Sequence, residues 1–261
     1  YFDRDQEALD KAKEVYDKMT ALGKEDTEAM RVAEYLYGWQ LFMTDQYAES
    51  LKVLEEAYKK LEITKDVSYE CKKNIYNNYG QVLYTYAEDV VAHNQVMMQW
   101  LLACDEEIRA REMAYGAYSR KANRIRQDKA DVYLKLDQEE ETLKIQKEIY
   151  EAMKGQYKEN DIRLCTYKLD RAQTYWRLGE YQAALALLFE MEVIYQMNQA
   201  EEEEYIALYG EIRDCYFQLE EYDKAYDYGC KVVDIEERVS GKLFSARAGE
   251  LQYLADICRM Q

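Results

Sequence analysis

The segments RAQTYWRLGEYQAAL (Arg171–Leu185) and IRDCYFQLEEYDKAY (Ile212–Tyr226) decide the fold, because they align without a gap at a spacing of 41 residues. Each contains two aromatic residues, a polar residue and Leu, then a short polar link, and then the pattern Tyr-x-x-Ala. Two antiparallel helices joined by a tight turn need a side chain that packs across that turn, here Tyr181 or Tyr222, and a small residue where they approach. Neither pair can bury its apolar stripe alone, so we expect the next pair to complete the core.

The same pattern recurs along the whole chain. The core position of the first helix in successive pairs is filled by Leu41, Leu83, Tyr133, Tyr175, Tyr216 and Ile257. We predict an all-α, right-handed α-solenoid of about six antiparallel helix pairs with a period of about 41–42 residues. It forms a single domain over residues 1–261, with an irregular join near 104–116. At that join, Cys104–Glu107 is predicted to start a long helix that runs towards Leu136.

The composition favours helix throughout. The chain has 261 residues, no proline and 10 glycines. Proline costs about 3 kcal/mol inside a helix, and β-sheet proteins need Gly, Pro or Asn-Gly turns about every ten residues. Tyrosine is abundant, with 27 Tyr against 5 Phe, and its apolar ring and polar tip suit helix contacts whose rims stay in water.

The net charge argues against nucleic acid and membrane partners, and the cysteines argue against disulfides and a metal site. The net charge is −17 and the pI about 4.7, so we expect no nucleic acid partner for this segment and no membrane partner. The uncharged stretch Val90–Cys104 is too short and too polar to span a bilayer. The six cysteines form no CxxC pair, which is typical of free thiols in a reducing cytoplasm. We therefore predict a cytoplasmic protein without a metal or another cofactor.

The sequence contains no recognisable catalytic constellation. HExxH, Walker and GxGxxG motifs are missing from it. The single histidine, His93, lies in the apolar neighbourhood of Val91, Met97 and Met98, which favours a packed or rim histidine over a general base. We predict that this segment is not an enzyme.

The repeat resembles the tetratricopeptide repeat (TPR) family. The segment IYNNYGQVLY (Ile75–Tyr84) matches the first-helix pattern of the family, and a second match begins at Tyr37-Gly38. The usual period of the family is about 34 residues, so the longer period here implies longer helices. The best copies lie at residues 31–64, 165–197 and 206–238.

The long period and the Tyr-rich helices also resemble the solenoid domain of peptide-sensing transcriptional regulators of Gram-positive bacteria. In those proteins a helix-turn-helix DNA-binding domain precedes the solenoid. The resemblance implies a sensor or interaction domain of a bacterial cytoplasmic regulator that acts in signalling and binds an extended peptide on its concave face. The chain starts at Tyr1 rather than Met, so we expect a fragment of a longer protein.

Three asparagines and a glutamine form the most informative candidate site. Asn74, Asn77, Asn78 and Gln81 recur at i, i+3, i+4 and i+7, so they share one face of the predicted helix. Asn is a poor helix former, and side-chain amides can pair with the backbone of a peptide of any sequence. The resemblance implies the same use. The alternative is a solvated polar face or an inter-helix hydrogen bond.

Residues of two neighbouring helices complete the predicted site. An aromatic set on the preceding helix forms either an apolar pocket or ordinary core packing. The basic stretch Ile108–Lys129 supplies two arginines on one helical face, which either clamp a carboxylate or neutralise neighbouring acidic helices. Together with the amide stripe, the predicted peptide-binding residues are Tyr84, Tyr35, Trp39, Phe42, Arg120, Arg124, Gln127 and Asp131.

Two hypotheses of function follow from the sequence. The first is a module that binds a peptide or protein, with the amide stripe on the floor of an open groove. The second is a structural scaffold or self-association module with no groove ligand, in which neighbouring side chains fill that groove. An acidic, Tyr-rich surface permits a homodimer in either case.

Overall fold

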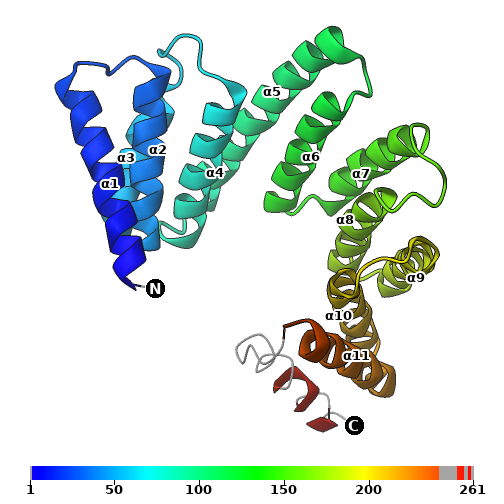
Figure 1. Ribbon diagram of the computed structural model, residues 1–261. Helices are drawn as coiled ribbons and strands as arrows, with labels where there is room; N and C mark the ends of the chain where they lie inside the picture. The colour runs from blue at the N-terminus through cyan, green and yellow to red at the C-terminus, as the bar shows by residue number, and fades with distance from the viewer. Residues whose placement is uncertain (1, 241–251, 256–257, 260–261) are drawn as a thin grey trace. The chain divides into compact units, whose positions relative to one another are not determined.

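The computed structural model describes residues 2–240, 252–255 and 258–259. In this part of the chain every regular element is an α-helix, and there is no strand. The core position predicted at Ile257 lies outside the described residues. The helices shown in Figure 1 are α1 (Phe2–Ala21), α2 (Glu28–Met43), α3 (Tyr47–Lys60), α4 (Tyr69–Thr85), α5 (Val90–Tyr115), α6 (Arg120–Lys135), α7 (Glu139–Lys154), α8 (Leu164–Arg177), α9 (Tyr181–Asn198), α10 (Glu202–Gln218) and α11 (Tyr222–Ser240).

The chain divides into two compact units, unit 1 (Tyr1–Asp137) and unit 2 (Gln138–Gln261). In unit 1, each of the helices α1–α6 packs against the next, and α2 also packs against α4 (Figure 1). In unit 2, each of the helices α7–α11 packs against the next, and α8 also contacts α10. These contacts confirm the predicted all-α architecture of stacked antiparallel helix pairs.

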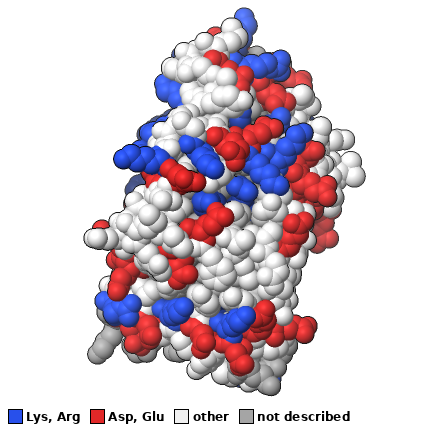
Figure 2. Space-filling model, turned by 90° about the vertical axis from the view of Figure 1, so that its right-hand side faces the viewer, with Lys and Arg blue, Asp and Glu red and all other residues white. Residues whose placement is uncertain are grey.

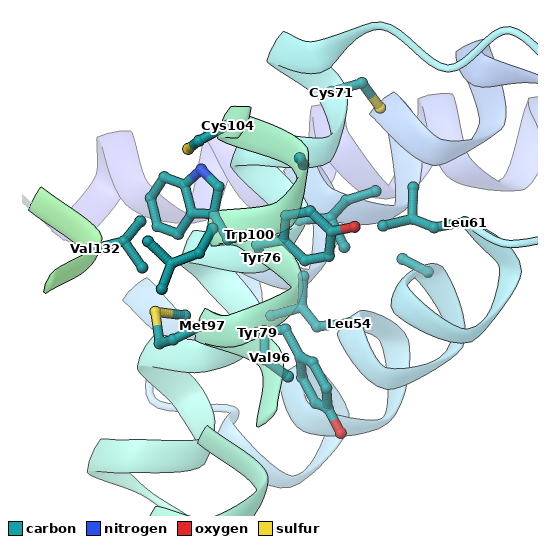
Figure 3. Packing of buried hydrophobic residues seen from close by; sticks show 14 of the residues in the cluster. Leu54, Leu61, Cys71, Tyr76, Tyr79, Val96, Met97, Trp100, Cys104 and Val132 are labelled. Atoms are coloured by element: carbon teal, nitrogen blue, oxygen red, sulfur yellow. The ribbon is translucent and has the colours of Figure 1, made fainter. Parts of the chain in front are cut away.

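The core of unit 1 lies where α3, α4 and α5 meet. Leu54 from α3 and Met97 from α5 are completely buried, and Trp100 is 3% exposed. Figure 3 shows these three side chains within the core. The two predicted core leucines of this unit, Leu41 and Leu83, are also buried. Because each fully buried side chain of this size stabilises the fold by about 1.5–3 kcal/mol, this cluster holds the three helices together.

In unit 2 the aromatic side chains pack across the turns as predicted. The ring of Tyr181 lies 6.2 Å from that of Trp176, and the ring of Tyr222 lies 5.7 Å from that of Phe217, both edge to face. The small residues of the two Tyr-x-x-Ala patterns, Ala184 and Ala225, are completely buried. Edge-to-face aromatic pairs add about 0.5–1.5 kcal/mol beyond the area that they bury.

A residue in the left-handed conformation follows the first helix of each pair. Its φ lies between 51° and 74° at Asp45, Glu88, Asp137, Gly179 and Glu220. Glycine adopts this conformation freely, whereas the Cβ of any other residue approaches the following carbonyl oxygen. Four of these five links therefore carry backbone strain, and only the link at Gly179 avoids it.

Exchanging residues at these links should change stability in opposite directions. Glu220→Gly should raise the free energy of unfolding of unit 2 by about 0.5–1 kcal/mol, because relief of the left-handed strain exceeds the extra chain entropy of glycine. Gly179→Glu should lower it by about 1–2 kcal/mol. A Cβ at Gly179 meets no atom within 4 Å, so this loss comes from the backbone alone. Urea unfolding of both variants checks the prediction, and shifts of the same sign would contradict the backbone explanation.

The predicted long helix from Cys104–Glu107 towards Leu136 is wrong. Helix α5 continues through these residues to Tyr115 and ends at Gly116, whose φ is 94°. Helix α6 starts separately, because the Ser119 hydroxyl accepts a hydrogen bond from the backbone N–H of Ala122 at 3.3 Å. An acidic run suits a helix start, but here Asp105–Glu107 lies inside α5, where Asp105 pairs with Lys129 of α6 and Glu107 pairs with Arg111 of α5 itself.

Candidate functional site

The amide stripe lies on α4, beside the buried face of that helix. The Ser68 hydroxyl caps α4 by accepting a hydrogen bond from the backbone N–H of Cys71 at 3.3 Å. Asn74, Asn77 and Gln81 are half-buried, and Asn78 is buried. The four amides therefore share one helical face, which is partly open to solvent.

Three of these amides already have partners within unit 1. The Asn77 side-chain N–H donates to the side-chain oxygen of Asn78 at 3.3 Å. Asn74 hydrogen-bonds the hydroxyl of Tyr35 on α2, and this bond opposes the increase in the Tyr35 pKa that burial causes. An inter-helix hydrogen bond, one of the alternatives that the sequence left open, is thus present at Asn74.

The aromatic set on α2 is partly core and partly surface. Tyr35 and Phe42 are half-buried and pack against the core of unit 1, so core packing accounts for much of their presence. The half-buried Trp39 stacks on Phe42, with ring centroids 5.3 Å apart. Beside them, Leu36 and Met43 are 43% and 52% exposed. An apolar surface therefore borders the amide stripe on the α2 side, because α2 packs on α4.

The residues predicted on α6 lie on the other side of α4. Arg120, Arg124 and Asp131 are exposed, and Gln127 is half-buried and donates to Asp131 at 3.4 Å. Their spacing of four, three and four residues places all of them on one helical face. Tyr84, the last predicted residue, is 53% exposed at the end of α4.

Helices α4 and α6 are joined by a buried polar contact that the sequence did not predict. The Asp128 carboxylate accepts hydrogen bonds from the Lys73 ammonium at 2.5 Å and from the Tyr69 hydroxyl at 3.1 Å. The Tyr69 hydroxyl also accepts a hydrogen bond from the Trp100 indole N–H at 3.4 Å. This network fixes the position of α6, with its row of Arg120, Arg124, Gln127 and Asp131, relative to the amide stripe on α4. A lysine and an aspartate 55 residues apart give no local signal that they pair.

The single histidine also joins helices of unit 1. The His93 imidazole lies with Nδ1 2.9 Å from the carbonyl oxygen of Gly80 on α4 and with Nε2 3.2 Å from that of Lys135 on α6. The side chain is 5% exposed, which confirms the predicted packed histidine. It therefore connects α5 to both neighbouring helices.

Part of the basic stretch is neutralised, as one of the sequence alternatives stated. The Lys129 ammonium lies 2.7 Å from the Asp105 carboxylate, and Arg126 pairs with Glu112. On the face of the molecule shown in Figure 2, cationic and acidic side chains are likewise interspersed. Arg124 differs from Lys129 and Arg126, because it forms no ion pair with any residue that the structure describes.

Asp131 carries a charge that the fold disfavours. Burial raises the pKa of Asp131, the nearby Asp128 carboxylate raises it further, and Gln127, Lys73 and Lys135 oppose the increase. Part of the side chain nevertheless reaches solvent, so this carboxyl is crowded by protein atoms and still accessible. Ionisable groups with perturbed pKa values concentrate at functional sites.

Other features of the described residues involve none of the residues of this face. A cavity of about 360 Å³ in unit 2 is lined by α9, α10 and α11 residues such as Tyr205 and Lys231. Among the residues with described positions, no group of His, Cys, Asp or Glu side chains is placed to hold a metal ion. No helix in this part of the chain combines the length and apolar character needed to cross a bilayer.

Comparison with known proteins identifies the fold. No protein-family model and no curated protein sequence matches the chain. BtubC (BKLC) from P. vanneervenii aligns with a TM-score of 0.58 at 12% identity, over 91% of this chain and 92% of that chain. A putative kinesin light chain with nearly identical TPR-like repeats from Podosopora anserina aligns with a TM-score of 0.57 at 13% identity, over 73% and 85%.

A third similar structure is aspartyl phosphate phosphatase F from Bacillus subtilis. It aligns with a TM-score of 0.52 at 16% identity, over 89% of this chain and 61% of that chain. Identities this low establish a shared fold and nothing further. The chain therefore has the TPR-like helical-repeat fold that the sequence predicts.

Proposed function

We propose that unit 1 binds an extended peptide across the face formed by α2, α4 and α6. The observation that carries this proposal is the amide stripe of α4, which lies between an apolar surface on α2 and a cationic residue on α6. Side-chain amides can donate to and accept from a peptide backbone whatever its sequence. The flanking surfaces then select among peptides.

The surfaces on either side of the amide stripe define which chemical groups the peptide carries at its two ends. Exposed Leu36 and Met43 beside Trp39 suit an apolar anchor residue. Arg124 suits a carboxylate, because a guanidinium can bind it through two parallel hydrogen bonds. Helices α2 and α4 pack directly, with their axes about 8–10 Å apart, whereas α4 and α6 are joined through long side chains such as Lys73. The two flanks are therefore separated by at least roughly 20 Å, or about six or more extended residues. We therefore propose a short peptide with an apolar residue near one end and an acidic group near the other.

The cellular role that we propose is that of a sensor or interaction domain in a bacterial cytoplasmic regulator, without catalytic activity of its own. This role rests on the resemblance of the long, Tyr-rich repeats to peptide-sensing regulators. The alternative is a scaffold with no ligand on this face, and the bond between Asn74 and Tyr35 favours it, because that bond occupies one of the four amides.

A thermal-shift screen against pools of six- to eight-residue peptides tests the proposal. A ligand at about 100 times its Kd stabilises by about 2.7 kcal/mol. Because each kcal/mol raises the Tm of a chain of this size by about 2–4 °C, the expected shift is roughly 5–10 °C. We expect a shift for the parent protein and its loss in Asn77→Ala/Asn78→Ala. The control Asn160→Ala/Gln182→Ala removes two exposed amides of unit 2 and should keep the shift.

Each variant is compared with its own ligand-free Tm, because Asn78 is buried and its removal alone changes stability. If no pool shifts the parent protein while circular dichroism shows normal helicity, the peptide-binding proposal is wrong and the scaffold hypothesis takes its place.

A further inference from the structure

The outer face of α5 differs from the rest of the chain because it carries no charge. Charged residues make up 33% of the sequence, yet Val90–Cys104 contains none. On this stretch Val91, Met98 and Leu102 are 69%, 52% and 55% exposed, and Gln95 is exposed beside them. The face therefore presents apolar and amide groups to solvent, and nothing on it repels an acidic surface.

The opposite face of α5 is occupied by the core of unit 1. Val96, Met97 and Trp100 are buried there, and Figure 3 shows them among the core side chains. Helical geometry places residues spaced by three or four positions on one face. The exposed apolar residues of α5 are consequently a second stripe, distinct from the one that holds unit 1 together.

The exposed stripe has the spacing of a helix–helix seam. Val91, Gln95, Met98 and Leu102 follow one another at four, three and four residues, which is the d-a-d-a order of two heptads. Three of these positions are apolar and one is polar. A single polar residue at an a position sets the register and the number of partners in such seams.

We propose that two copies of this chain associate through this face, with α5 of one packed against α5 of the other. A contact between identical surfaces closes into a two-fold dimer. Two chains that each carry a net charge of −17 repel one another, and the repulsion is smallest where both surfaces lack charge. A second copy therefore fits this face. The inference is independent of the proposed peptide site.

The dimer should be weak and should become tighter as salt is added. Two heptads bury less than the roughly 800 Å² per partner of a standard interface, so dimerisation depends on protein concentration. Salt screens the repulsion between the acidic chains without weakening apolar contacts. An interface made of ion pairs would show the opposite salt dependence.

Sedimentation velocity over a concentration series at low and high salt tests the inference. We expect the parent chain to pass from monomer to dimer and Met98→Glu to weaken the association by about 30-fold or more, because a buried charge at the centre of an interface is a large loss. Met113→Glu is the matched control. Met113 is on the same helix and 90% exposed but lies beyond the charge-free stretch, so this variant should dimerise like the parent chain.

A mixture of Met98→Glu and Met98→Lys should recover dimers, since position 98 lies near the middle of the seam, within reach of its own counterpart. Circular dichroism confirms that each variant is folded. A parent chain that stays monomeric at every concentration overturns the inference. So does equal weakening by Met98→Glu and Met113→Glu, which would show that added negative charge alone is responsible.

Discussion

Replacing Arg31 with Met should lower the free energy of unfolding of unit 1 by about 3–5 kcal/mol. The side chains of Arg31 and Glu34 are 0% and 2% exposed, and their nearest nitrogen and oxygen atoms lie 3.1 Å apart. The Arg31 guanidinium also donates to the backbone carbonyl of Glu25 at 2.6 Å. Without Arg31, the Glu34 carboxylate is buried with only the Lys60 ammonium, 3.5 Å away, as a counter-charge.

The loss in Arg31→Met should shrink as the pH falls. Burial raises the pKa of Glu34, and Arg31 and Lys60 oppose that increase; removal of Arg31 therefore raises this pKa further. An acid whose pKa is raised in the folded state stabilises the fold below its unfolded pKa, and this contribution is lost as the pH rises through the folded pKa. Urea unfolding at several pH values should show the variant regaining stability as acidification approaches the ordinary glutamate pKa of 4.5 from above.

The double variant Arg31→Met/Glu34→Leu separates charge from packing. Apolar replacement of both members of a buried ion pair is often neutral, and atoms of this pair, including Nε of Arg31 and Oε2 of Glu34, have no hydrogen-bond partner among the described residues. We expect the double variant to lie within about 1 kcal/mol of the parent protein. A double variant as unstable as the single one would mean that Arg31 acts through its volume.

Reversing the charge at Arg124 should invert the peptide preference of unit 1. In the parent protein, peptides with an apolar residue at one end and Asp or Glu at the other should bind about 10–100 times more tightly than the same peptides ending in Lys. In Arg124→Glu the order should reverse, because a carboxylate replaces the guanidinium that recognises the acidic group. Titration of the two peptide pools, followed by thermal shift, measures both preferences.

Lys52→Glu is the matched control for this charge reversal. Lys52 is exposed on α3, which does not belong to the face formed by α2, α4 and α6. Both variants change the net charge equally, so equal effects would indicate long-range electrostatics instead of contact at Arg124. A different outcome is peptide binding that requires Asn77 and Asn78 and yet is equally tight for peptides ending in Glu and in Lys. That result would support the peptide site and contradict the proposed recognition of an acidic end by Arg124.

The helix pairs and their turns could be predicted because their determinants are local. Tyr181 and Tyr222 pack on aromatic residues only five positions earlier in the chain, because the tight turn between the two helices of a pair brings its flanking residues into contact. The amide stripe of α4 is equally local, since its members lie within two turns of one helix.

The break between α5 and α6 could not be placed, because helical periodicity continues through the acidic run after Cys104. Part of what stabilises that run inside a helix is the cation Lys129, which lies 24 residues from its partner Asp105, whereas the pair between Glu107 and Arg111 is local. The local sequence gives the charge of a segment, but it does not indicate which distant residue will neutralise that charge.

The sequence by itself determined the helical content, the repeat, the packing across the turns and the faces on which the amides and arginines lie, because each of these depends on residues within a few turns of one another. Only the tertiary structure decided how these faces are used. It tied Asn74 to Tyr35, joined Lys73 to Asp128, neutralised Arg126 and left Arg124 without an ion pair in the described part of the chain. Such pairings depend on which helices stack side by side, and the sequence of one helix does not specify which helices these are.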